Sequence, residues 1–341
     1  MTSSKFVRHL TLAKNIVVLD GLTGTGKTMF SPLLASMEKM QNPRFEYMFE
    51  YLLIAAKQAR INEDAANTLI RLLTDIKLYD GSISRDVNFR PSDLSGVFAN
   101  KNGFKYLKQL LAQDGNDAQA KIELESPKLL LVTHQIFSCL DVLNNCFGDS
   151  VKIVEMVRHP LYLIDHWLSY IDMHCVNPRD FTLWLQSNDQ TIVPWFAEGW
   201  EEQYQKMTSI ERVVKSIDVL MQPIYKAIKN SQKNFLIIPF EDFVLKPFPH
   251  LKRLEVFLGS SLTPGSNFIL EKQNVPRHFI SNGPLKKIYA RYNFTGRNTG
   301  QTDRDEYEDK FTKLKEKYGL SVYNQVLNMS EEYHSRFGHW F

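Results

Sequence analysis

The segment from Asn15 to Phe30, NIVVLDGLTGTGKTMF, limits what this chain can fold into more than any other segment. An apolar, β-branched run ends at Asp20. The next eight residues, GLTGTGKT, satisfy the pattern G-x-x-x-x-G-K-[ST] before a helix-like stretch begins. In such a loop, glycines let backbone N–H groups approach an anion closely, and the dipole of the following helix adds positive potential. Lys27 contributes a full charge, so the segment predicts a site for a phosphate-type anion between a strand and a helix.

The composition is that of an ordinary globular protein. The chain has 341 residues, 43% of them hydrophobic, which is enough for a large buried core. A net charge of +3 without a long Lys/Arg run gives little support to a nucleic-acid or membrane-surface partner. Cys139, Cys146 and Cys175 are too few and too irregularly spaced for a disulfide framework or a zinc site. No window reaches the roughly 18 to 20 apolar residues of a membrane span, so we expect a soluble, cytoplasmic protein that is not exported.

Short apolar runs bounded by breakers predict buried parallel strands. These runs are Asn15–Asp20, Lys128–Thr133, Val151–Val157 and Asn234–Phe240. Helical periodicity is found at Phe30–Met40, Ala65–Ile76, Gly103–Ala112, Pro160–Met173, Glu201–Asn230, Pro249–Leu258 and Asp303–Tyr318. Because no repeat or Pro/Gly/Ser-rich linker divides the chain, we expect one domain over residues 1–341. Its fold class is α/β, three layers with a central parallel sheet and helical insertions, which places ligands at the carboxyl ends of the strands.

The ends of the second and third predicted strands do not suit a metal-dependent nucleotide enzyme. A kinase or nucleoside triphosphatase usually needs a strand-end Asp to hold Mg²⁺. The chain instead reads VTH at residues 132–134 and VRHP at residues 157–160, and the guanine-specifying Asn/Thr-Lys-x-Asp element is absent. A base and a guanidinium therefore stand where a metal carboxylate is expected, and we expect no metal.

Several stretches in order along the chain resemble the sulfotransferase family, which has a P-loop-containing fold. SPKLLLVTHQIF is similar to that family's strand ending in Thr-His, and VKIVEMVRHPLYLIDHWLSY to its strand and helix for the 3′-phosphate of the donor nucleotide. NFLIIPFEDFVLKPFPHLKRLEVFLG resembles the late strand, the Tyr-Glu-Asp-like turn and the Phe-Leu-Gly helix. TGRNTG, residues 295–300, is similar to the basic glycine loop that closes over the same 3′-phosphate. Each piece is weak alone, but their order from residue 15 to about residue 300 makes chance agreement improbable.

The resemblance implies 3′-phosphoadenosine 5′-phosphosulfate (PAPS) as co-substrate, with a role for each matching residue. His134 falls at the family's general base, and a His of near-neutral pKa suits removal of a hydroxyl proton. Arg158 would grip the 3′-phosphate through its planar fork, with Arg297 from the late loop. The 5′-phosphosulfate would be held by Thr23, Gly24, Thr25, Gly26, Lys27 and Thr28.

The chain departs from the family pattern at two of these places. Where the family has a phosphate-binding Ser, eight residues after Arg158, this chain has His166. A ring N–H could replace that hydroxyl, and Ser169 lies on a similar helical face. In the glycine loop, Leu22 stands at the place of the family's usual lysine, and Lys27 stands where an ordinary phosphate-loop lysine would be. Lys27 can stabilise charge developing on the leaving phosphate if its amine reaches the bridging oxygen.

The sequence therefore predicts a sulfotransferase that transfers the sulfuryl group of PAPS to a hydroxyl or amine of a small-molecule or glycan acceptor. His134 and Lys27 are the expected catalytic residues, and neither the acceptor nor the oligomeric state follows from the sequence. Two alternatives stay open. The intact Gly26-Lys27-Thr28 permits a small-molecule kinase that uses ATP and Mg²⁺, and the departures at Leu22 and His166 permit a non-catalytic nucleotide-binding protein of the same fold.

Overall fold

A parallel β-sheet forms the centre of the computed structural model, which describes residues 4–91, 93, 96–99, 103–111, 117–173, 176–187, 190–230, 233–281, 283 and 300–341. Within these residues the sheet has five strands in the order β2-β3-β1-β4-β7. The strands are β1 (Ile16–Asp20), β2 (Arg44–Phe45), β3 (Leu129–Val132), β4 (Val151–Val157) and β7 (Phe235–Pro239). All pairings in this sheet are parallel, so the carboxyl ends of the strands share one edge.

The middle strand β1 pairs with β3 on one side and with β4 on the other. Val18 lies opposite Leu131 of β3 on one side and Ile153 of β4 on the other. All of β1 is buried, as expected for a strand whose two faces are covered by helices. The four predicted strands are confirmed to within one residue at each end. The edge strand β2 was not predicted, because two residues contain no apolar run.

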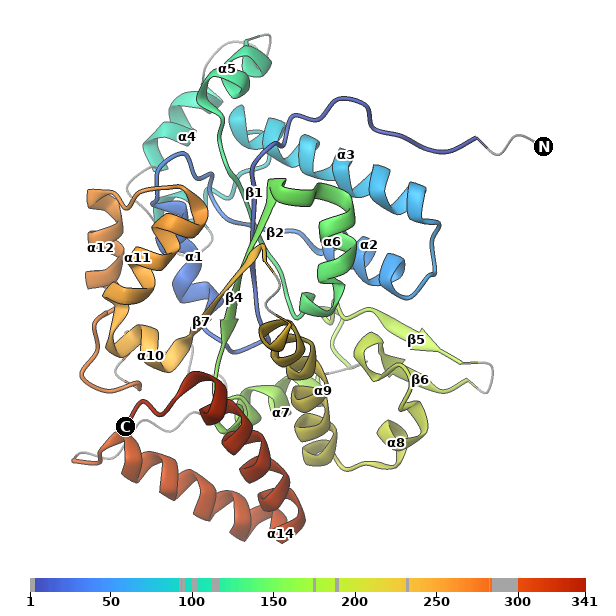
Figure 1. Ribbon diagram of the computed structural model, residues 1–341, viewed down its shortest axis with the longest axis vertical. Helices are drawn as coiled ribbons and strands as arrows, with labels where there is room; N and C mark the ends of the chain where they lie inside the picture. Colours follow the sequence, from blue (N-terminus) through green and yellow to red (C-terminus); the bar gives the residue numbers. More distant parts are fainter. Residues whose placement is uncertain are drawn as a thin grey trace.

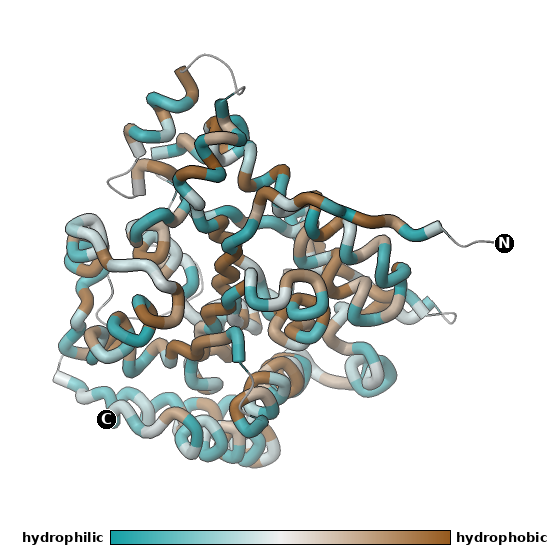
Figure 2. Tube along the Cα trace, turned by 45° about the horizontal axis from the view of Figure 1, so that its top comes forward, coloured by the Kyte–Doolittle hydropathy of each residue, from teal (hydrophilic) through white to brown (hydrophobic). Residues whose placement is uncertain are grey.

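Helices cover both faces of the sheet, which makes the three-layer α/β/α arrangement that the sequence predicted (Figure 1). On one side lie α1 (Lys27–Ala35), α10 (Phe240–Leu245), α11 (Pro247–Leu258) and α12 (Pro264–Lys272). On the other side lie α2 (Tyr47–Lys57), α3 (Glu63–Ser82), α6 (Leu140–Phe147) and α9 (Ser209–Lys229). The trace in Figure 2 is most hydrophobic along the central strands, where the side chains are almost completely buried.

The remaining elements lie at the two ends of the sheet. Near the carboxyl ends of the strands are α7 (Ile164–Asp172) and α14 (Asp303–Phe337), and at the opposite end are α4 (Gly103–Leu110) and α5 (Ala118–Glu125) (Figure 1). An antiparallel hairpin of β5 (Trp184–Gln186) and β6 (Ile192–Pro194) leads to α8 (Glu201–Lys206). No helix among the described residues is both long enough and apolar enough to span a bilayer.

Local sequence explains where two predicted helices differ from the observed ones. The helix predicted over residues 201–230 is two helices, α8 and α9, because Thr208 and Glu211 form a capping box that starts a new helix. The helix predicted to end at Tyr318 continues as α14 to Phe337, with a kink at Gly319, whose φ of 82° is favourable for glycine. The first helix begins at Lys27 rather than Phe30, so Lys27 and Thr28 belong to its first turn.

Candidate active site

The glycine loop, residues 21–28, joins β1 to α1 at the carboxyl edge of the sheet. Gly21, Gly24 and Gly26 have φ values of 145°, 94° and 99°, which residues with a Cβ rarely adopt. A Cβ on Gly26 would also lie 2.6 Å from the ring of Phe240. The pattern needs its glycines here for two reasons, positive φ and close packing against neighbouring elements.

Protein donors occupy successive carbonyl oxygens of this loop. Thr25 donates its backbone N–H and its hydroxyl to the Leu22 carbonyl, at 3.2 and 2.8 Å. The Trp167 indole N–H donates to the Thr23 carbonyl, and Arg158 Nη1 donates to the Gly24 carbonyl, each at 2.9 Å. Since a trans peptide directs its C=O and N–H to opposite sides, the amide N–H groups of Thr23 and Gly24 turn away from those donors, whereas the Thr25 N–H is used within the loop. In the first turn of α1, Met29 and Phe30 donate their N–H groups to the Gly26 carbonyl, so the N–H groups of Lys27 and Thr28 are the ones that an anion could use there.

Lys27 lies beneath the loop. Its ammonium group donates to the Gly21 carbonyl and, at 3.0 Å, to the Leu22 carbonyl, and the residue is only 5% exposed. Burial lowers the pKa of Lys27, and the negative charge of nearby Asp20 opposes that shift. The lysine is thus bonded to the loop itself and has to exchange these carbonyls for phosphate oxygens when it contacts a ligand.

Beneath Lys27 is a pair of buried carboxyl groups that sequence reasoning missed. Asp20 ends β1, Glu155 lies opposite it in β4, and both are completely buried. Thr133 donates its hydroxyl to Asp20 Oδ1 at 2.9 Å. Burial raises the pKa of both carboxyl groups, and for Glu155 the charge of Asp20 raises it further. The Asp20 position was visible in the sequence, but its pairing with Glu155 depends on the register between β1 and β4.

His134 follows β3 and is held beside the loop. The backbone N–H of Gln135 donates to the Gly21 carbonyl at 3.2 Å, which fixes this turn against the glycine loop. His134 Nδ1 lies 3.0 Å from Glu50 Oε1 of α2. The imidazole stacks on Tyr47, with ring centroids 5.7 Å apart and 5° between the planes. The His134 side chain is 25% exposed, so it is oriented by its neighbours and still accessible.

Burial disfavours the charged form of both His134 and Glu50. Burial lowers the pKa of His134 to about 3, helped by the positive charge of Lys27. Burial raises the pKa of Glu50 to about 8, against the effect of Lys27. The near-neutral pKa expected for His134 from the sequence is therefore wrong for the protein without ligand, because burial and Lys27 lower it. His134 is a neutral imidazole at neutral pH, and when Nδ1 carries the ring proton and donates to Glu50, Nε2 has a lone pair for a proton. Glu50 was missed because it comes from a helix 84 residues earlier in the chain.

Arg158 lies on the other side of the glycine loop from His134 and Glu50. Besides its bond to Gly24, its guanidinium lies 4.5 Å above the Phe240 ring and its Nε is 3.9 Å from Glu241 Oε1. Glu241, which is buried, also accepts the His159 backbone N–H at 3.1 Å and the Tyr333 hydroxyl at 2.8 Å. This carboxylate connects the end of β4 to the C-terminal helix α14, a link that no sequence motif indicated.

The other residues predicted to bind the 3′-phosphate differ in where the structure places them. The His166 ring packs against Gly24, where an added Cβ would be 3.3 Å away, and burial lowers the pKa of His166 to about 4. Ser169 donates its hydroxyl to the Asp165 carbonyl of its own helix at 3.3 Å. Arg297 lies outside the described residues. The structure thus brings the glycine loop, Arg158 and His166 together, with His134 on the loop's opposite flank, while the roles of these residues stay predictions.

The described residues contain no group of three His, Cys, Asp or Glu side chains arranged to hold a metal ion. Asp20, Glu155 and Glu50 surround Lys27 instead. The site therefore combines the glycine loop with a buried lysine below it, an imidazole–carboxyl pair on one side and a guanidinium on the other.

No family model and no curated protein matches this sequence. Among solved structures, the chain is similar to the sulfotransferase domain of the Synechococcus PCC 7002 olefin synthase, with 13% identity, a TM-score of 0.43 and coverage of 94% of both chains. It is also similar to the sulfotransferase STF1 of Mycobacterium tuberculosis H37Rv, with 13% identity, a TM-score of 0.38 and coverage of 82% of this chain and 76% of that one. For the sulfotransferase STF9 of Mycobacterium avium the values are 12%, 0.40, 96% and 78%. Sulfotransferases are thus among the structures that this chain resembles, at identities and TM-scores too low to transfer a site residue.

Proposed function

We propose that this protein transfers the sulfuryl group of PAPS to a hydroxyl or amine of a small-molecule or glycan acceptor. The observation that carries the proposal is the position of His134, which is a neutral, accessible imidazole held by Glu50 beside the glycine loop. In the transfer, the acceptor oxygen or nitrogen bonds to sulfur, the bond from sulfur to the bridging oxygen of the donor breaks, and the acceptor proton goes to His134 Nε2.

Glu50 orients the base in this scheme. A carboxyl oxygen at Nδ1 fixes the ring orientation. Because burial raises the pKa of Glu50 to about 8, this carboxyl group is mostly protonated at neutral pH, so its contribution there is to orient the ring. The Tyr47 ring, stacked on His134, restricts its rotation. The geometry supports general-base catalysis because the imidazole is already oriented before the acceptor enters.

The loop and its lysine would hold the 5′-phosphosulfate. Lys27 would leave the Gly21 and Leu22 carbonyls and donate to the bridging oxygen, where negative charge develops as the sulfuryl group departs. Arg158, with Arg297 and with His166 or Ser169, would hold the 3′-phosphate. PAPS itself supplies an activated sulfuryl group, so fixed positive charge and positioning are the protein's contribution.

Nucleotide binding tests the proposal directly. We expect tight binding of adenosine 3′,5′-bisphosphate without Mg²⁺ in isothermal titration calorimetry, and much weaker binding of AMP, which lacks the 3′-phosphate. His134→Ala should then keep the affinity for the bisphosphate and lose transfer of radiolabelled sulfur from PAPS to an acceptor pool. Full transfer by His134→Ala would contradict the assignment of the base.

One observation favours a kinase as the second candidate. Asp20 ends β1 beside Lys27, so an acidic group does lie under the loop, although its burial raises its pKa. A kinase would bind ATP with Mg²⁺ better than adenosine 3′,5′-bisphosphate. That preference, measured in the same titration, would overturn the sulfotransferase proposal.

A further inference from the structure

A cavity lies at the opposite edge of the sheet from the glycine loop. It has a volume of about 360 Å³ and is lined by the segment before β2, the end of α3, the helices α4 and α5, and Pro127 before β3. Its floor is at the amino end of β3, because Met40 pairs with Lys128 and Gln41 donates its backbone N–H to the Lys128 carbonyl at 2.9 Å. Figure 1 shows α4 and α5 at this end and α7 and α14 at the other. The volume is within the range of small-molecule sites.

Positive charge in the lining is not balanced. Lys39, Lys105 and Lys121 come from three different segments, and Glu125 is the only acidic residue among the described residues of the lining. Glu125 lies 3.9 Å from Lys121, a weak contact within one helix. In the part of the chain that the structure describes, no carboxylate pairs with Lys39 or Lys105. The lining therefore has an excess of positive charge that an anion would neutralise.

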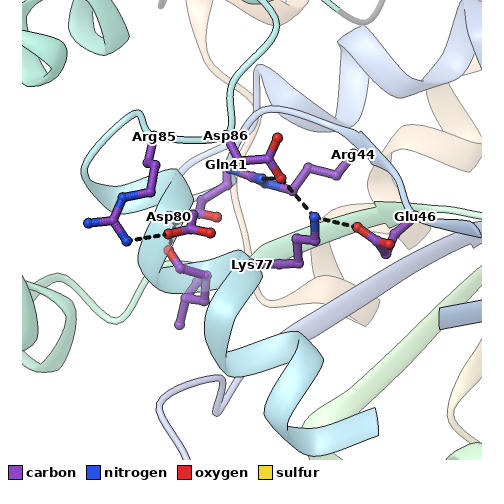
Figure 3. Close-up of polar contacts among 8 residues, drawn as sticks. Gln41, Arg44, Glu46, Lys77, Asp80, Arg85 and Asp86 are labelled. Atoms are coloured by element: carbon purple, nitrogen blue, oxygen red, sulfur yellow. Dashed lines mark hydrogen bonds and ion pairs between the residues drawn. The ribbon is translucent and has the colours of Figure 1, made fainter. Parts of the chain in front are cut away.

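Three cations near Gln41 are arranged differently. Figure 3 shows the cations beside this cavity, where Arg44 contacts Asp86 at 3.1 Å, Lys77 contacts Glu46 at 2.7 Å, and Arg85 contacts Asp80 at 3.2 Å. Each of these cations has a carboxylate partner from the fold. What distinguishes the cavity is that its lysines converge from separate segments on one lining that contains a single carboxylate among its described residues.

Lys39 is held at the cavity by its backbone. Its φ is 59°, a left-handed conformation that is uncommon for lysine, and its carbonyl accepts the Lys128 N–H at 2.8 Å. Burial lowers the pKa of Lys128, and the positive charges of Lys152 and Lys39 lower it further. Like charges have therefore gathered at this edge of the sheet, which costs stability unless a counter-charge is present.

Gln41 gives the cavity a second recognition element. The residue is 6% exposed, and its amide nitrogen donates to the Leu78 carbonyl at 3.2 Å and to the Ser82 hydroxyl at 3.1 Å. Its Oε1 is buried and has no hydrogen-bond partner. Gly81 lies against that oxygen, and a Cβ there would come within 2.6 Å of it. A buried acceptor without a donor is costly, and because a Cβ at Gly81 would also come within 2.7 Å of Arg44 Nη2, only glycine fits beside the Gln41 amide.

We propose that this cavity binds a phosphorylated small molecule that also carries a hydroxyl or amino group. The phosphate would contact Lys39, Lys105 and Lys121, and the hydroxyl or amino group would donate to Gln41 Oε1. The site lies at the amino edge of the sheet, so it is separate from the glycine loop and does not depend on the proposed sulfotransferase activity.

Labelling with pyridoxal 5′-phosphate tests the site, because this probe carries a phosphate, a hydroxyl and a lysine-reactive aldehyde. After borohydride reduction, peptide mass spectrometry reports each lysine separately. We expect faster labelling at Lys39, Lys105 or Lys121 than at Lys206, whose side chain is 80% exposed, and about tenfold protection of the cavity lysines by inorganic pyrophosphate. Labelling there no faster than at Lys206, or no protection, would overturn the proposal.

Charge reversal gives the matching equilibrium test. Lys39→Glu with Lys121→Glu should weaken the binding of pyridoxal 5′-phosphate and so slow its labelling of Lys105 about tenfold or more. The control pair Lys206→Glu and Lys229→Glu makes the same change of net charge on exposed residues elsewhere and should leave Lys105 labelling unchanged. Equal loss in both double variants would show a general charge effect and refute a built site. If nucleotide binding at the glycine loop fails, these readouts are unaffected, since they concern other peptides.

Discussion

The substitution Glu50→Gln tests how the raised pKa of Glu50 affects the free energy of unfolding. Glutamine keeps the shape and one oxygen for His134 but cannot ionise. Glu50 has a side chain 7% exposed, and burial raises its pKa from 4.5 to about 8. Between these values the folded state keeps a proton that the unfolded state loses, so this group's contribution to stability is complete below pH 4.5 and falls as the pH rises towards 8. At 1.36 kcal/mol per pH unit, the interval from pH 5 to pH 7.5 corresponds to about 3 kcal/mol.

The assay is chemical denaturation of the parent and of Glu50→Gln across that pH interval. We expect Glu50→Gln to gain about 3 kcal/mol relative to the parent between pH 5 and pH 7.5, because the variant has no proton to lose. The difference removes the titration of other groups shared by both proteins. Glu202→Gln is the matched control, since its side chain is 92% exposed, and should change by less than about 0.5 kcal/mol. A difference between Glu50→Gln and the parent that does not vary with pH would refute a raised pKa of Glu50.

Other predictions concern the loop and its supports. Arg158→Ala removes the donor to Gly24 and should raise the Kd of adenosine 3′,5′-bisphosphate about 10- to 100-fold in calorimetry; unchanged affinity would remove Arg158 from the site. Tyr333→Phe leaves buried Glu241 without its hydroxyl donor and should cost about 1 to 3 kcal/mol in denaturation; no loss would mean that this bond is dispensable. Gly26→Ala forces a Cβ to a φ of 99° and against Phe240, so it should cost about 1 to 3 kcal/mol and abolish nucleotide binding. Normal binding by this variant would contradict the anion loop.

The central strands and the loop were predictable because their signals are local. Apolar runs such as IVVLD indicate buried strands, and glycine followed by Lys-Thr marks the turn into α1. The two-residue strand β2 was not predictable, because it exists only through pairing with β3. The break at Thr208 had a local signal, the capping box with Glu211.

The candidate site was predictable where one residue follows a strand and not where partners come from distant segments. His134 and Arg158 could be placed beside the loop from the sequence because each follows a strand at its carboxyl end. Glu50 and Glu241 were missed as partners of these residues, since α2 and α10 reach the site only through the packing of the whole sheet. The same holds for the cavity with Lys39, Lys105 and Lys121, which are separate surface lysines in the sequence.

The sequence by itself determined the four central strands, several of the helices between them, the glycine loop and the residues at the strand ends. It could do so because periodicity, glycine conformation and helix starts act within a few residues. Only the tertiary structure decided that Lys27 is bonded back to the loop, that Asp20 and Glu155 share a buried position beneath it, and that Glu50 holds His134. Those facts depend on strand register and packing, which bring together residues far apart in the chain. The burial and the neighbouring charges that result shift the pKa of each group.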